Sequence, residues 1–145
     1  MISVKNWPNY FMEIAQLVSI RSKDPRKQVG AVIVDTNNRI LSTGYNGFPK
    51  GVFEHSHRWK KENKNLYVIH AEINALVHSR CDLTGSKIYS TLFPCLECAK
   101  AIIASGIVEV YYQEYKSKYE DSKALLIESG VGLHFIRKED DEESS

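Results

Sequence analysis

The sequence predicts an α/β fold, a three-layer α/β/α sandwich around a mixed five-stranded sheet. Short segments typical of strands alternate with segments whose apolar residues recur at helical spacing. A short turn joins the first two predicted strands, which makes them an antiparallel hairpin, whereas helices separate the last three. Because right-handed helical crossovers join parallel strands, we expect both strand orientations in one sheet and helices on both of its faces.

The first half of the chain predicts one helix, the hairpin and a long loop. Residues 8 to about 21 carry apolar side chains at helical spacing, and the proline at the start suits a first helical turn. The valine-rich run 29–35 predicts a buried strand, and the run 39–45 predicts its partner, because the Thr-Asn-Asn sequence at 36–38 favours a turn. Residues 46–65 are polar, and a loop this long is often functional.

The second half of the chain predicts three helices that alternate with three strands. Gly106 and Gly130 mark the ends of the second and third of these helices, because glycine favours the position just after a helix. The expected elements are a helix at 71–79, a strand at 86–93, a helix at 95–105, a strand at 108–113, a helix at 117–129 and a strand at 131–137.

Length and composition predict one globular domain. The chain has 145 residues, of which 43% are hydrophobic and 26% are charged, as in an ordinary folded domain. The first residues lack the apolar stretch of a signal peptide, and no apolar run is long enough to cross a bilayer. We therefore expect a cytoplasmic protein with no membrane partner, with a catalytic domain at 1–138 and an acidic, disordered tail at 139–145.

The charge of the chain is unevenly distributed. The last seven residues hold five acidic side chains and no basic one, so the rest of the chain has 19 basic and 13 acidic residues, a net charge of +6, against +1 overall. A mildly basic body suits a small anionic ligand such as a nucleotide. A nucleic-acid partner is not expected, because it would require a concentrated basic surface.

The three cysteines are expected to be free of disulfides. An odd number of cysteines in a cytosolic chain argues against a disulfide framework. Cys81 stands alone in the sequence and is expected to be a small, buried or half-buried thiol. Cys95 and Cys98 have the Cys-x-x-Cys spacing of metal ligands.

Two short segments carry the chemistry. His70-Ala71-Glu72 precedes one predicted helix, and Pro94-Cys95-Leu96-Glu97-Cys98 precedes the next. One imidazole and two thiolates are ligands that zinc prefers, and three protein ligands leave the fourth position for water, as in catalytic sites. A helix start also stabilises thiolate. Glu72 can stay off the metal and move protons between the water, the substrate ring and the departing group.

Each part of this pattern has an ordinary alternative. A Cys-x-x-Cys pair alone can be redox-active or half of a structural zinc site, and a lone glutamate at a helix start is favoured by the dipole. The combination favours a catalytic zinc site, with one zinc per chain. His55, His57 and His78 could add ligands for a second metal, but solvated loop histidines are the preferred interpretation.

The two segments together match the H-x-E and P-C-x-x-C signature of zinc-dependent nucleobase deaminases. Over nearly its whole length the chain resembles the deoxycytidylate deaminase family, which has the cytidine deaminase-like fold. The segments that carry the resemblance are 21–25, 29–32, 43–51 with its Gly-Tyr-Asn-Gly sequence, 70–75, 91–100 and, more weakly, 117–122. The resemblance implies hydrolysis of dCMP to dUMP and ammonia, which feeds dTMP synthesis.

The resemblance also implies residues that bind the substrate. Asn46 resembles the asparagine that holds the sugar, and Ala71 lies between the two reactive residues of its segment. Ser22 and Lys23 resemble residues near the nucleotide phosphate, and Tyr119 resembles an aromatic that closes over the substrate. The alternatives are a turn residue for Asn46 and, for the other three, a loop residue, a solvated charge and a helix-start aromatic. The alternative site for the phosphate is the basic stretch 58–64.

Many members of the family are homohexamers that dCTP activates and dTTP inhibits. The resemblance places Gly47 and Lys50 near the effector site, where Mg2+ would accompany a bound dCTP. Some members lack effectors, and some accept dCTP as a substrate, so a bifunctional dCMP/dCTP deaminase is an alternative. Two further alternatives are a deaminase of transfer RNA adenosine, against which the modest basic charge argues, and a non-catalytic, zinc-stabilised binding protein, which would have no use for Glu72.

Overall fold

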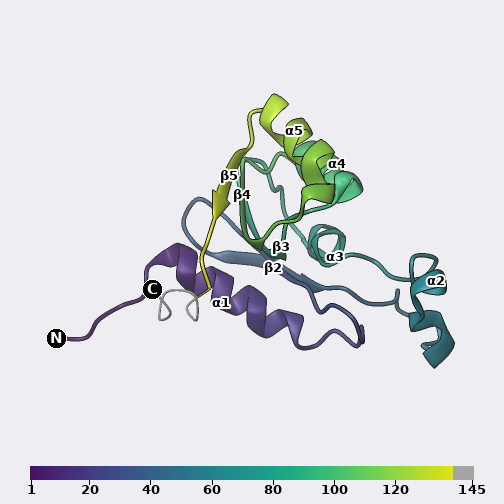
Figure 1. The fold of residues 1–145 in the computed structure, drawn as a ribbon. Helices are drawn as coiled ribbons and strands as arrows, with labels where there is room; N and C mark the ends of the chain where they lie inside the picture. The colour runs from purple at the N-terminus through teal and green to yellow at the C-terminus, as the bar shows by residue number, and fades with distance from the viewer. Residues whose placement is uncertain (139–145) are drawn as a thin grey trace.

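The structure is a computed structural model that describes residues 1–138 (Figure 1). The predicted acidic tail at 139–145 lies outside the described residues. The elements are α1 (Trp7–Ser19), β1 (Gly30–Val34), β2 (Ile40–Tyr45), α2 (Lys61–Lys64), α3 (Ala71–His78), β3 (Lys87–Leu92), α4 (Leu96–Ala104), β4 (Glu109–Glu114), α5 (Glu120–Glu128) and β5 (Gly132–Phe135), with 3-10 turns at Ser56–Trp59 and Ser117–Tyr119.

The five strands form one mixed sheet in the order β2-β1-β3-β4-β5. β1 pairs antiparallel with β2 and also with β3. β3, β4 and β5 are parallel to one another. The predicted hairpin and the three parallel strands are therefore confirmed, and β1 is where the orientation changes.

The sheet separates two hydrophobic cores, as a three-layer sandwich requires. α1 lies on one side of the sheet, and α3, α4 and α5 lie on the other (Figure 1). All five residues of β1 are buried, and its side chains alternate between the two cores. Val32 and Val34 join Phe11 of α1, whereas Ile33 joins the core under α3, α4 and α5. The predicted fold class is confirmed.

Two glycines let helices approach the sheet closely. A Cβ atom on Gly30 would collide with the backbone of α1 at Ala15. A Cβ atom on Gly44, in β2, would collide with the backbone of α3 at Ala71 and Ala75. The second contact matters for function, because α3 begins directly after His70 and carries Glu72.

The structure differs from the predictions in local details. The range 46–65, predicted as loop, contains α2 and the 3-10 turn before it. The predicted helix 117–129 begins with a 3-10 turn, and the last strand is shorter than 131–137. Cys81 is exposed, which contradicts the expected burial, because it lies in a surface connection between α3 and β3. No helix among the described residues is long and apolar enough to cross a membrane.

Candidate active site

Three metal-ligating side chains meet where α3 and α4 begin. His70 is the residue that caps α3, Cys95 caps α4, and Cys98 lies in the first turn of α4. The Sγ atoms of Cys95 and Cys98 lie 3.3 and 3.4 Å from Nδ1 of His70. The three ligand atoms all lie within 4.8 Å of one another, and they form the one such cluster within residues 1–138.

The geometry of this cluster fits zinc. Tetrahedral zinc with the usual bond lengths separates a sulfur ligand from a nitrogen ligand by about 3.6 Å. The two Sγ–Nδ1 distances of 3.3 and 3.4 Å are close to that value. His55, His57 and His78 are exposed and are not part of the cluster, in keeping with the interpretation that they are solvated.

The cysteine pair favours thiolate. A hydrogen bond from Cys98, supported by one from His70, lowers the pKa of Cys95 to about 4. The same pairing with Cys95, together with burial, raises the pKa of Cys98. Hydrogen bonding to Cys95 raises the pKa of His70 in turn. These directions favour a thiolate at Cys95 and a protonated ring at His70, so a bound cation would displace the proton from the imidazole and the one remaining on Cys98.

Glu72 lies beside the cluster in the first turn of α3 and is only 4% exposed. Burial raises the pKa of Glu72 to about 7, and the nearby Cys95 acts in the same direction. A carboxyl group with a pKa near neutrality can both accept and return a proton. The structure thus places a buried carboxyl group with a raised pKa next to the predicted metal ligands.

The second ligand segment is anchored by a residue that the sequence did not single out. The Oγ atom of Ser122, in α5, donates a hydrogen bond of 2.6 Å to the carbonyl oxygen of Pro94. Ser122 is 1% exposed, so this bond holds α5 against the turn that presents Cys95 and Cys98. A lone serine inside a helix gives no sequence signal for such a role, because the contact spans 28 positions.

A cavity of about 440 Å³ opens over the cluster. Asn46, Ala71 and Tyr119, all predicted to bind substrate, line it together with His70 and Glu72. The remaining lining residues are Lys27, Val29, Lys64, Asn65, Val68, Leu92, Phe93, Cys95, Leu96, Lys116 and Lys118. The four lysines come from three segments far apart in the chain, which explains why the sequence did not group Lys27 and Lys64 with Lys116 and Lys118.

The side-chain amide of Asn46 is held by three backbone or side-chain partners. Nδ2 donates to the carboxylate of Asp24 at 3.2 Å and to the carbonyl oxygen of Lys27 at 2.9 Å. Oδ1 accepts the N–H of Val29 at 2.8 Å. Asn46 is therefore more than a turn residue, since its amide orientation is fixed within the wall of the cavity.

Ser22 and Lys23, which were predicted to lie near the phosphate, do not line the cavity over the metal ligands. Ser22 is buried, and its hydroxyl donates to the carbonyl oxygen of Asn46 at 2.8 Å. Lys23 is exposed and pairs with Glu54 at 3.5 Å. Lys23 lines a smaller cavity of about 110 Å³, which Asn46 and Gly47 also line.

The smaller cavity contains only one of the two predicted effector residues. Gly47 lines it, together with Lys23 and Arg21. Lys50 is exposed at a turn and lines neither this cavity nor the larger one.

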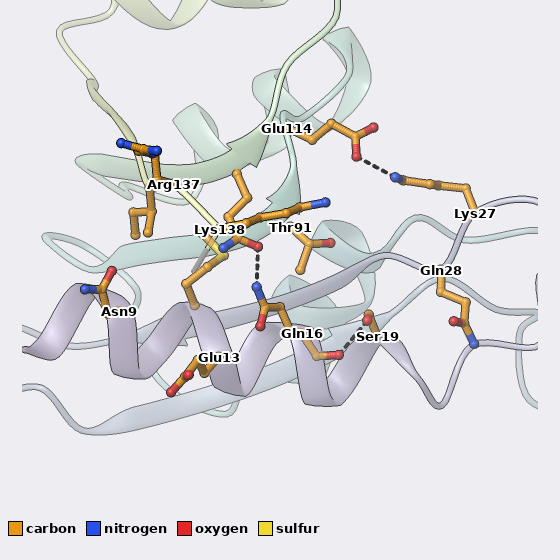
Figure 2. Close-up of a pocket in the computed structure, with 13 residues that line it drawn as sticks. Asn9, Glu13, Gln16, Ser19, Lys27, Gln28, Thr91, Glu114, Arg137 and Lys138 are labelled. Carbon is orange, nitrogen blue, oxygen red and sulfur yellow. Dashed lines mark hydrogen bonds and ion pairs between the residues drawn. The ribbon is translucent and has the colours of Figure 1, made fainter. Parts of the chain in front are cut away.

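Another cavity, of about 390 Å³, lies against α1, on the opposite face of the sheet (Figure 2). Gln16 and Glu13 of α1 and Gln113 and Glu114 of β4 line it. Lys27 lines both this cavity and the one over the cluster.

Comparison with known proteins agrees with this geometry. Residues 5–114 match the family described as the cytidine and deoxycytidylate deaminase zinc-binding region. A probable deoxycytidylate deaminase of Caenorhabditis elegans is 49% identical over 123 residues, which cover 80% of this chain and 62% of the worm protein. The deoxycytidylate deaminase of Homo sapiens is 46% identical over 138 residues, which cover 89% of this chain and 78% of the human one. The chain thus spans less than two thirds of the worm relative.

Solved structures lead to the same family. The dCMP deaminase of cyanophage S-TIM5, crystallised with dCMP and dUMP, superposes with a TM-score of 0.80 at 32% identity, covering 92% of this chain and all of the phage chain. A tRNA:A34 deaminase superposes with a TM-score of 0.58 at 20% identity, a likeness of fold alone. With the sequence matches, these comparisons confirm the predicted family and show that the chain is an enzyme of the deoxycytidylate deaminase family.

Proposed function

We propose that the protein hydrolyses dCMP to dUMP and ammonia with one zinc ion per chain. The observation that carries this proposal is the convergence of His70 and Cys95 and Cys98 within 4.8 Å, beside the buried Glu72, at a 440 Å³ cavity. The named relatives at 46–49% identity support the same reaction. The cavity volume lies within the range usual for small-molecule sites.

The reaction follows from the residues around the cluster. Zinc held by His70, Cys95 and Cys98 would supply a Lewis acid that makes a bound water nucleophilic near neutral pH. Glu72 takes one proton from the attacking water and delivers it to the ring nitrogen, then takes the second proton from the same oxygen and delivers it to the amine, which leaves as ammonia. Its burial raises the pKa of the carboxyl group to about 7, so the group can both accept and donate a proton at physiological pH.

The walls of the cavity orient the nucleotide. Both N–H groups of the Asn46 amide are in use, but its Oδ1 accepts only the N–H of Val29 and can accept a second hydrogen bond from a sugar hydroxyl, and the backbone of Ala71 would lie beside the base. Tyr119 is 8% exposed, and its ring lies 6.3 Å from that of Phe93, so it can cover the base from the side. Together these residues exclude bulk water from the reacting amine.

The 5′-phosphate is bound by the lysines that line the same cavity. The ammonium groups of Lys27 and Lys64 pair with the carboxylates of Glu114 and Asp24 at 2.6 and 2.5 Å. The ammonium of Lys118 instead lies 5.3 Å from the centre of the Tyr119 ring. Lys118 is therefore the cation most available to an added anion. Ser22 supports the backbone of Asn46 from behind, and Lys23 lies outside this cavity, near the smaller one.

The effector site proposed for this protein is the smaller cavity at Gly47. Arg21 and Lys23 would meet the phosphates of dCTP there, with Mg2+ on those phosphates. Lys50 would approach such a ligand from the adjoining turn. The family resemblance supports activation by dCTP, inhibition by dTTP and a homohexameric assembly. The proposed cytoplasmic location rests on the first residues and the short apolar runs of the sequence.

The test uses the purified 145-residue chain and the absorbance change on deamination. We expect turnover of dCMP, a much lower specificity constant for deoxycytidine, and one zinc per chain by elemental analysis. Turnover of dCTP at a similar rate would favour the bifunctional alternative. Zinc binding without turnover of any cytosine nucleotide would contradict the proposal.

Two lysine variants separate the two phosphate assignments. Lys118→Ala should lower the preference for dCMP over deoxycytidine by about tenfold or more, the value of one charge-assisted hydrogen bond. Lys23→Ala should leave that preference nearly unchanged and alter only the response to dCTP. A loss of this preference in Lys23→Ala but not in Lys118→Ala would instead assign phosphate binding to Lys23.

A further inference from the structure

A buried carboxylate links three segments at the rim of the active-site cavity. Asp24 lies in the connection between α1 and β1, and its side chain is fully shielded from solvent. A carboxylate in such a place is costly unless charges and hydrogen bonds compensate for the lost water. Its contacts therefore indicate what the protein gains from keeping it.

Both oxygens of Asp24 are fully used. Oδ2 accepts a hydrogen bond of 2.5 Å from Nζ of Lys64 and one of 3.2 Å from Nδ2 of Asn46. Oδ1 accepts the backbone N–H groups of Arg26 at 2.8 Å and Lys27 at 3.3 Å. Although burial alone would raise it, these contacts hold the pKa of Asp24 below its ordinary value, so the group is ionised.

The two side chains held by Oδ2 both line the cavity over the metal ligands, whereas Asp24 itself does not. Lys64 comes from α2, and Asn46 follows β2, so the carboxylate ties two otherwise separate segments to the loop before β1. It also fixes the amide of Asn46, because a flipped amide would turn Oδ1 toward the carboxylate. A lysine side chain otherwise samples many rotamers, and holding it in place removes that entropic cost from binding.

We propose that Asp24 is a positioning residue for the sugar-phosphate part of the substrate, acting by holding the ammonium of Lys64 and the amide of Asn46 in the cavity wall. This inference rests on the proposed function. Asp24 lies behind the wall and away from the group that transfers protons, so it sets the affinity for the nucleotide and leaves the chemical step largely unchanged.

The main test is Asp24→Asn in the full chain with zinc bound. The neutral amide cannot hold the ammonium of Lys64, and its own NH2 group faces two donors. We expect KM for dCMP to rise about 10-fold to 100-fold, the range of one or two charge-assisted hydrogen bonds. We expect kcat to change far less and the zinc content to stay at that of the wild type.

Asp35→Asn is the matched control. Asp35 also accepts two backbone N–H groups, from Asn37 at 2.8 Å and Arg39 at 3.0 Å, but it caps the hairpin turn between β1 and β2 and lines neither cavity. We expect Asp35→Asn to weaken these backbone hydrogen bonds as Asp24→Asn weakens those of Asp24, but to leave KM for dCMP unchanged. The contrast separates positioning from general stability.

The neutral pair Asp24→Asn/Lys64→Met keeps the test valid if the single variant folds poorly. It removes both buried charges, so it should unfold at a temperature closer to that of the wild type, yet it should show the raised KM for dCMP. Wild-type KM in either variant, with turnover of dCMP intact in the wild type, overturns the inference. A wild type that does not turn over dCMP overturns the proposed function first, and the inference with it.

Discussion

The sheet separates two cavities of similar size that differ in chemistry. The cavity over the metal ligands has a volume of about 440 Å³, and the one against α1 has about 390 Å³. In the cavity against α1, two pairs of polar side chains satisfy each other: Nε2 of Gln16 donates to Oε1 of Gln113 at 2.6 Å, and Lys27 pairs with Glu114 at 2.6 Å. Figure 2 shows the pair of Lys27 and Glu114.

The active-site cavity contains groups whose interactions are unusual. Burial raises the pKa of Glu72 to about 7, and hydrogen bonding lowers the pKa of Cys95 to about 4. No histidine or cysteine lines the cavity against α1. Volume therefore does not identify the functional site here, and the distinguishing feature is a set of titratable groups with shifted pKa values that lie against one another.

The largest expected contrast between the two cavities concerns the metal. Removing zinc with a chelator should abolish deamination, and adding zinc back should restore it, because the nucleophile depends on the metal. Cys98→Ala should lose zinc as well as activity, measured by elemental analysis. Cys81→Ala, at the exposed cysteine, is the control and should retain one zinc per chain. Full activity in a zinc-free preparation would contradict the assignment.

The next contrast concerns two glutamates, one in each cavity. Glu72→Gln should lower kcat by about 10²–10⁴-fold with zinc retained, because acid–base catalysis contributes that much. Glu13→Gln changes the same functional group on α1, in the other cavity, and should leave kcat unaltered. Steady-state kinetics with dCMP measures both. Equal effects from the two variants would remove the distinction between the cavities.

The two zinc-site segments could be predicted from the sequence because the reactive residues of each segment lie close together in the chain. His70 and Glu72 are two positions apart, Cys95 and Cys98 three, and each pair begins a helix. The sheet was accessible for a similar reason, since connection lengths fix strand orientation. The order of the strands, with β1 between β2 and β3, depends on tertiary packing and could not be read from spacing.

The contacts that the sequence could not predict join residues that lie far apart in the chain. Lys64 reaches Asp24 across 40 positions, and Ser122 reaches Pro94 across 28. Such pairs leave no periodic signal. α2 was missed because a helix of four residues shows no hydrophobic spacing. Cys81 was misplaced because burial is the usual state of a free cysteine, and a surface connection overrides that tendency.

A smaller effect is expected on acid stability. The pKa of Asp24 lies below its ordinary 3.8 in the folded protein, so its ionised form stabilises the fold above that value. This contribution is lost as the pH falls through the folded pKa. The free energy of unfolding in urea, measured from about pH 5 downward, should therefore fall more steeply for the wild type than for Asp24→Asn. Parallel curves would show that Asp24 titrates normally.

The smallest expected effect is in the cavity against α1. Gln16→Leu removes the hydrogen bond to Gln113, which is 8% exposed and would lose its partner. That loss should cost about 1 kcal/mol and lower the unfolding temperature by about 2–5 °C. Turnover of dCMP should not change, because the proton-transfer group and the metal ligands lie on the other face of the sheet.

This last variant is informative because the two cavities are not isolated from each other. Gln113 directly precedes Glu114, and Glu114 pairs with Lys27, which lines both cavities. A rise in KM for dCMP on Gln16→Leu, with Gln113→Leu giving the same rise, would mean that Lys27 transmits packing changes through the sheet. Unchanged kinetics in both variants, together with the lower unfolding temperature, would show that the cavity against α1 contributes only to stability.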